Sequence, residues 1–155
     1  MKRVSIERTI YLADTDATGF AYYARYFEWM ESARMDMLRS AGGSIDLLRA
    51  EGITAVVRET ACRYTAPLKL GDAVDVECWV SHIGKTSLAI DYQFSNKTTG
   101  APAGNGSVVV VFITINSGRP TKIPPSIRAG IEPFSTIANA NGGNTDPSSA
   151  QGFNE

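Results

Sequence analysis

The chain has 155 residues, a formal net charge of −1 at pH 7 and 43% hydrophobic residues. That length suits one domain with its own core, and the near-neutral charge argues against a nucleic-acid or anionic-membrane partner. No apolar run could span a bilayer, and the polar N-terminus lacks a signal-peptide core. Cys62 and Cys78 fall in strand patterns without a C-x-x-C motif, which predicts free buried thiols and a cytoplasmic protein.

Residues 3–12 suit a first strand, and the run Asp-Thr-Asp-Ala-Thr-Gly at 14–19 follows it. This run stands just ahead of a long helical pattern. A helix start carries unsatisfied N–H donors and a partial positive charge, so it can hold an oxyanion. A nearby Asp could attack a carbonyl carbon or activate water. The combination is typical of acyl transfer.

The pattern over residues 22–41 predicts an amphipathic helix, because its apolar residues recur at helical spacing. The expected apolar face comprises Tyr23, Tyr26, Phe27, Met30, Ala33, Met37, Leu38 and Ala41. Charged and polar residues lie opposite, and Gly42-Gly43 should end the helix. Ser44 is then expected to cap a short second helix over residues 45–51, which Gly52 closes.

From Ile53 onward the hydrophobic period changes to two, as in residues 74–80 and 88–94, which indicates half-buried strands. Residues 107–115 are almost continuously apolar, which predicts a central strand covered on both faces. The resulting fold class is α+β: one strand, a long helix, then four antiparallel strands wrapped around it. Residues 1–134 would form the domain. Residues 135–155, rich in Ser, Asn and Gly, are expected to be a disordered low-complexity tail.

Several segments together resemble the 4-hydroxybenzoyl-CoA thioesterase family. They are residues 11–19 followed by Tyr22 and Tyr26, the helix segment 30–34, and Gly118-Arg119-Pro120 with Ile123-Pro124. The likeness covers residues 3–134. It implies a hotdog fold, with a five-stranded antiparallel sheet around one long helix, and hydrolysis of acyl- or aryl-coenzyme A thioesters without a separate cofactor, since coenzyme A is part of the substrate.

The resemblance also implies roles for particular residues. The second Asp of the motif, Asp16, would be the nucleophile or general base, and the backbone N–H of Tyr23 in the first helical turn would be the oxyanion donor. Gly19, Phe20 and Tyr26 would contact the substrate. The chain departs from many acyl-CoA members in having Tyr23 in place of His and Thr18 in place of Ala or Gly. The aromatic residue is closer to the aryl-CoA branch.

In the family, a turn that matches residues 83–87 grips the coenzyme A nucleotide, so Lys85 and Thr86 are candidate phosphate contacts. The resemblance further implies a homodimer or homotetramer with active sites between subunits. The exposed edges of a five-stranded sheet independently favour such pairing. Two alternatives remain open at this point: a non-catalytic protein that binds acyl thioesters, and a thioesterase that acts on acyl carrier protein. A dehydratase is disfavoured, because the helix contains no His.

Other polar residues have structural interpretations. Asp14 is expected to be an acceptor that ties down its loop. Arg34 falls near the centre of the apolar helix face and needs a partner, for which Glu31 and Glu59 are the candidates. A second catalytic role for Glu31 is the less favoured alternative. His82, the single histidine, should be a solvent-facing residue near a turn. One His and two separated Cys predict no metal site.

Overall fold

The computed structural model describes residues 1–136, and residues 137–155 lie outside the described part. The elements in chain order are β1 (Val4–Thr9), the 3-10 helix η1 (Leu12–Asp14), α1 (Arg25–Ser40), α2 (Ile45–Ala50), β2 (Ile53–Tyr64), β3 (Ala73–Ile83), β4 (Ser87–Asn96), β5 (Pro102–Thr114), α3 (Pro125–Ile131) and the 3-10 helix η2 (Glu132–Phe134).

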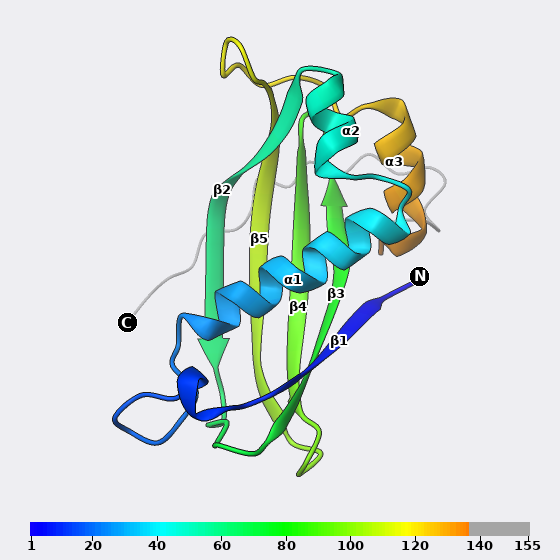
Figure 1. Ribbon diagram of the computed structural model, residues 1–155. Helices are drawn as coiled ribbons and strands as arrows, with labels where there is room; N and C mark the ends of the chain where they lie inside the picture. The colour runs from blue at the N-terminus through cyan, green and yellow to red at the C-terminus, as the bar shows by residue number, and fades with distance from the viewer. Residues whose placement is uncertain (137–155) are drawn as a thin grey trace, which may run out of the picture.

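The five strands form one antiparallel sheet in the order β1-β3-β4-β5-β2, and α1 crosses one face of it (Figure 1). β1 and β2 are therefore the two edges. The prediction of an α+β fold with one strand, a helix and four further strands is confirmed. Ser44 caps α2 as expected: its side chain accepts a hydrogen bond from the Leu47 N–H at 3.1 Å.

The core lies between α1 and the sheet face that it covers. Alternate residues of β3 and β4 are buried there, among them Val76, Ile90 and Phe94. β5 was expected to be covered on both faces, which is wrong for this chain. Val108, Val110 and Phe112 are buried, whereas the residues between them are only half-buried. Among residues 1–136, no helix covers the opposite face of the sheet (Figure 1).

α1 begins at Arg25, three residues later than predicted, so Tyr22 and Tyr23 precede the helix. The reason is a competing local contact. The Tyr22 N–H donates to the Asp14 C=O at 2.7 Å, and the Tyr22 C=O accepts from the Arg25 N–H at 2.9 Å. These bonds fix a turn immediately before the helix. The placement of Tyr23 in the first helical turn is therefore corrected.

Arg34 has the partner that its spacing suggested. Its guanidinium pairs with the carboxylate of Glu31, three residues earlier on α1, and its side chain is only 13% exposed. The predicted apolar face is also largely confirmed, since Tyr26, Met30, Ala33 and Met37 are buried. Trp29 is buried as well, outside the predicted stripe.

The end of the described chain packs against the core and the sheet. α3 approaches the C-terminal end of α1 so closely that a Cβ atom at Gly130 would lie 1.9 Å from the Ala41 carbonyl oxygen. Beyond it, Ser135 forms a parallel bridge with Val80, and the Thr136 N–H donates to the Val80 C=O at 3.0 Å. β1 pairs with β3 only as far as Cys78, so these two residues continue the pairing. Ser135 and Thr136 were predicted to belong to the disordered tail, which is wrong for these two residues. The rest of the predicted tail, residues 137–155, lies outside the described residues.

Candidate active site

Asp16 lies in a tight turn between η1 and α1. Its N–H donates to the Phe20 C=O at 3.1 Å, and its C=O accepts from the Gly19 N–H at 3.0 Å. Gly19 has a φ of +80°, a left-handed conformation that glycine adopts without steric cost. The turn therefore depends on the backbone freedom of Gly19. Its N–H is already used in the turn and is not available to a substrate.

The Asp16 carboxylate is exposed, and one of its two oxygens is held in place. Oδ1 accepts from the Thr18 N–H at 2.8 Å and also from the Thr18 hydroxyl. These two bonds lower the pKa of Asp16 below the ordinary value of 3.8. Oδ2 receives no hydrogen bond from residues 1–136. Asp16 is thus an oriented, ionised carboxylate with one free oxygen.

A pocket of about 310 Å³ opens beside this carboxylate. Its walls come from the Asp16 turn, the segment before α1, the first turn of α1 and the end of β2 with the loop after it. The residues that line it are Asp16, Thr18, Phe20, Ala21, Tyr23, Tyr26, Tyr64, Thr65, Ala66, Pro67 and Leu68. The fold thus brings together four of the predicted site residues, and most of the remaining wall is apolar or aromatic.

Tyr23 lines this pocket together with Asp16, and its backbone N–H lies before the start of α1. Among the described residues, none accepts a hydrogen bond from it, because the helical ladder starts later in the chain. The Tyr23 C=O is fixed by the Tyr64 hydroxyl, which donates to it at 3.2 Å. A free N–H next to a fixed carbonyl is a candidate donor for an oxyanion.

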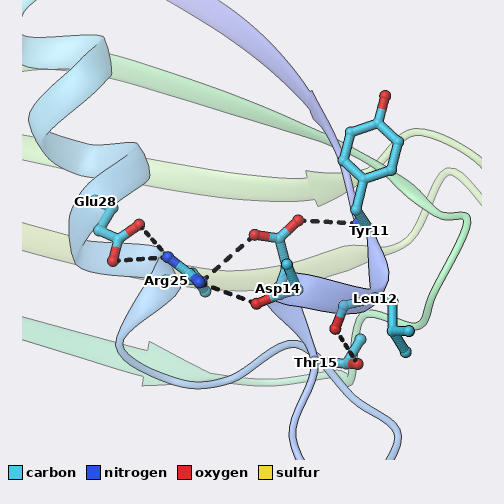
Figure 2. A network of polar contacts seen from close by, with 7 residues as sticks. Tyr11, Leu12, Asp14, Thr15, Arg25 and Glu28 are labelled. Carbon is cyan, nitrogen blue, oxygen red and sulfur yellow. Dashed lines mark hydrogen bonds and ion pairs between the residues drawn. The ribbon is translucent and has the colours of Figure 1, made fainter.

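Asp14 and Arg25 connect the loop before Asp16 to the start of α1 (Figure 2). The Asp14 carboxylate accepts from the Tyr11 N–H at 2.9 Å and lies 3.4 Å from Nε of Arg25. Arg25 also donates to the Ala13 C=O at 2.9 Å and pairs with Glu28 on α1. Asp14 therefore ties the loop to the helix start, as its structural interpretation predicted.

The aromatic wall is packed as one cluster around Tyr26. The ring of Tyr26 contacts those of Tyr64 and Phe94 edge-on, with centroids 4.8 Å and 5.0 Å away. Tyr26 is 3% exposed, and burial raises its pKa to about 12, so its hydroxyl stays protonated at neutral pH. A rigid aromatic wall of this kind favours a flat apolar group beside Asp16.

The structure does not bring Lys85 and Thr86 to this pocket. They follow β3, at the end of the sheet where Ser87 pairs with Val111 and Val111 pairs with Val56. The Asp16 pocket lies at the Tyr64 end of the same β2 strand. Eight residues of strand separate the two ends, roughly 26 Å. Within one chain, the predicted phosphate contacts are therefore remote from Asp16.

Seven of the eleven lining residues were not among the predicted site residues, including Tyr64, Pro67, Leu68 and Thr18. The first three reach the pocket only because β2 folds back beside α1, and no local signal announces that. Thr18 did have a local sequence signal, because a hydroxyl two residues after an Asp is placed to donate a hydrogen bond to the Asp carboxylate. His82 is exposed on β3 and lines no part of this pocket, and Cys62 and Cys78 are free thiols.

Among residues 1–136, no group of three or more His, Cys, Asp or Glu side chains is arranged to hold a metal ion. In the same part of the chain, no helix is both long and apolar enough to cross a membrane.

Comparison with known proteins places the fold and the family. Residues 10–131 match the model of the thioesterase-like superfamily. The acyl-CoA thioester hydrolase YbgC of Escherichia coli is 32% identical over 120 residues, which cover 77% of this chain and 89% of that protein. A 1,4-dihydroxy-2-naphthoyl-CoA thioesterase from Synechocystis superposes with a TM-score of 0.77 at 21% identity, covering 84% of this chain and 96% of that one.

A Staphylococcus aureus protein solved in complex with CoA superposes with a TM-score of 0.83 at 16% identity, over 99% of this chain and 96% of its own. These likenesses confirm the hotdog fold, and the family model covers most of the chain. The chain therefore belongs to the thioesterase-like superfamily and is a thioester hydrolase.

Proposed function

We propose that the protein hydrolyses acyl- or aryl-coenzyme A thioesters, with Asp16 as nucleophile or general base and the Tyr23 N–H as oxyanion donor. The observation that carries the proposal is that Asp16 and Tyr23 line one pocket, and that among residues 1–136 neither Asp16 Oδ2 nor the Tyr23 N–H has a hydrogen-bond partner. The names of the relatives support the substrate class, since they include an acyl-CoA thioester hydrolase and a naphthoyl-CoA thioesterase.

The chemistry needs only this carboxylate, water and backbone donors. In one route, Oδ2 attacks the thioester carbon, the CoA thiolate leaves, and water hydrolyses the resulting mixed anhydride. In the other, the carboxylate removes a proton from a water molecule that attacks the same carbon. Both routes yield the free acid and CoA, and in both the Tyr23 N–H would stabilise the negative oxygen of the tetrahedral intermediate. No resident cofactor enters either route.

Release of free thiol from a panel of thioesters tests the proposal. The panel comprises benzoyl-CoA, naphthoyl-CoA and fatty acyl-CoA esters, with the same acyl groups on an acyl carrier protein. The aromatic pocket wall favours turnover of the aryl-CoA esters. If only the carrier-protein esters were hydrolysed, the substrate would be an acyl group carried by acyl carrier protein and not by CoA. Tight binding without thiol release would assign a non-catalytic binding protein.

The pH profile should report the lowered pKa of Asp16. Because the active form is the carboxylate and its pKa lies below 3.8, kcat/KM should stay level as the pH falls from about 7 to about 5. Activity is lost only as the pH falls through the pKa itself. In Thr18→Ala the hydroxyl bond to Oδ1 is absent, so the acid limb should move to higher pH. An acid limb near neutral pH in the native enzyme would assign the titration to another group.

We also propose that the protein is a homodimer, or a homotetramer built from such dimers, joined through β2. This strand is 12 residues long, and in residues 1–136 only one of its edges is paired, with β5. Val56 and Val57 on it are 40% and 50% exposed. An antiparallel two-fold pairing of β2 strands would set the Lys85 end of one chain toward the Asp16 end of the other. The phosphate contacts would then come from the second copy.

Light scattering should accordingly give a mass of at least twice 16.7 kDa at micromolar concentration. Lys85→Ala should raise KM for CoA esters, because the CoA phosphates would lose a cation, and should leave kcat nearly unchanged. Full activity of a diluted monomer would contradict a site shared between subunits.

The thiols support the predicted location. Cys62 and Cys78 are unpaired, and burial raises the pKa of both, that of Cys78 to about 12. Such thiols persist in a reducing compartment, which favours the cytoplasm.

A further inference from the structure

The open edge of β2 carries two charged residues at its centre. The strand spans Ile53–Tyr64 and pairs with β5 along one side only (Figure 1). Arg58 and Glu59 are its two middle residues, and both are exposed. Within residues 1–136, neither side chain forms a hydrogen bond or an ion pair. If two copies of the strand paired antiparallel about this centre, each charge would meet the opposite charge of the other copy.

A β-bulge at Arg58 decides which side chains of β2 face α1. Arg58 is the extra residue between the pairs Val57–Val110 and Glu59–Val109. Val110 is buried on the α1 side of β5, and paired residues of neighbouring strands lie on the same face. The α1 side of β2 is therefore formed by odd-numbered residues before the bulge and by even-numbered residues after it, namely Ile53, Ala55, Val57, Thr60, Cys62 and Tyr64.

The bulge restricts the registers in which two copies of β2 can continue one sheet. Residues that face α1 must pair with residues that face α1, which along the whole strand joins odd numbers of one copy to even numbers of the other. The two-fold axis then passes between two residues. With the axis between Arg58 and Glu59, all 12 residues pair, and each Arg58 lies opposite a Glu59. The nearest alternative registers set Glu59 opposite Val56 or Thr60, which carry no charge.

We propose that two copies of β2 pair about an axis between Arg58 and Glu59, with an ion pair between these residues on each side of the axis. A bulge bends an edge strand away from a straight partner, but here the two bulges lie next to one another, so the bend in one copy matches the bend in the other. The register follows from the strand itself and does not depend on the reaction that the protein catalyses.

This register also brings a residue of the second copy to the Asp16 pocket. Ile53 of the partner subunit lies opposite Tyr64, with the two Cα atoms about 5 Å apart and both side chains on the α1 side. Tyr64 lines the pocket and is 44% exposed, so this wall is open to solvent in a single chain. Ile53 of the partner subunit completes the wall. This role rests on the proposed thioester hydrolysis at Asp16.

Charge reversal tests the ion pairs. Arg58→Glu would set two glutamates opposite one another on both sides of the axis, so the dimer Kd from a sedimentation dilution series should rise about tenfold or more. Adding Glu59→Arg exchanges the charges and restores both pairs, so the double variant should return to within about threefold of the native Kd. Arg63→Glu is the matched control and should keep the native Kd, because Arg63 is exposed on the same strand and would lie opposite the uncharged Thr54. An unchanged Kd in Arg58→Glu, or no recovery in the double variant, would overturn the inference.

The distance between two spin labels measures the register without any assay of activity. The label is attached at Thr54→Cys in a Cys62→Ser background, since the remaining cysteine, Cys78, is buried. Thr54 would lie opposite Arg63 of the partner subunit, so the two labels should be nine strand residues or about 30 Å apart. A register shifted by two residues would change this distance by about 7 Å. Such a change, or a monomer, would contradict the proposed pairing.

Mixed dimers test the role of Ile53. One chain carries Asp16→Asn and has no working carboxylate, so only the Asp16 of the other chain can act. Ile53→Trp in the Asp16→Asn chain should fill the remaining pocket and abolish thiol release. Ile53→Trp in the other chain should leave about half of the native kcat, because one of the two sites still works. Equal activities, or the reverse order, would show that Ile53 does not act across the interface. Absence of thiol release from the native protein would contradict the proposed function, and the label distance would still decide the register.

Discussion

Asp16→Asn should lower kcat by a factor on the order of 10³ or more, with little change in stability or in substrate affinity. The amide keeps the shape of the side chain, and its oxygen can still accept from the Thr18 N–H and hydroxyl. What it loses is the negative charge on the oxygen that would attack the thioester carbon or accept a proton from water. Steady-state thiol release, with the Kd of a non-hydrolysable thioether analogue, separates the loss of chemistry from a loss of binding.

Asp14→Asn is the matched control for this substitution. It makes the same chemical change two residues away, at a carboxylate that bonds the Tyr11 N–H and pairs with Arg25 (Figure 2). Both side chains of that ion pair are partly exposed, so its loss should cost about 1 kcal/mol of unfolding free energy. The effect should appear mainly as a lower Tm. Near-native turnover by Asp16→Asn would refute the mechanism.

Gly130→Ala should be the most destabilising small substitution in the domain, at about 3 kcal/mol or more. The new Cβ would lie 1.9 Å from the carbonyl oxygen of Ala41 and 2.9 Å from its carbonyl carbon. Both atoms belong to the backbone, so no side-chain rotation can relieve the overlap and α3 must move away from α1. Thermal unfolding should show a fall in Tm on the order of 10 °C.

Ala129→Ser tests whether this effect is specific. Ala129 is the preceding residue on α3 and is exposed, so its substitution should change the unfolding free energy by less than about 0.5 kcal/mol. Folded Gly130→Ala protein should retain the native kcat, because neither Gly130 nor Ala41 lines the Asp16 pocket. Equal Tm values for both variants would mean that the helices can separate at little cost.

The parts of the fold that depend on local pattern could be predicted from the sequence. Helical spacing identified the buried face of α1, and it made Glu31 one of the two candidate partners of Arg34, the one with which Arg34 pairs. The start of α1 could not be predicted this way, because the bond from the Tyr22 N–H to the Asp14 C=O competes with the helix. The burial of Trp29 likewise depends on tertiary packing.

The residues of the candidate site likewise fall into those that local sequence could predict and those that only the tertiary fold brings together. Asp16, Phe20, Tyr23 and Tyr26 are close in sequence, and a resemblance to one short motif was enough to group them. Tyr64 and Leu68 are some 40 residues away, and only the return of β2 beside α1 brings them into the wall.

The two edges of the sheet are unequal, and this limits how far the protein can assemble. β1 is only six residues long and carries Glu7 and Arg8, and Ser135 and Thr136 cover the stretch of β3 beyond it. Short, charged and covered edges resist further strand addition, whereas β2 is long and partly apolar. A chain with one open strand edge can pair with a single partner through its sheet. Pairing through β2 therefore ends in a closed particle, and the same sheet cannot propagate into a fibre.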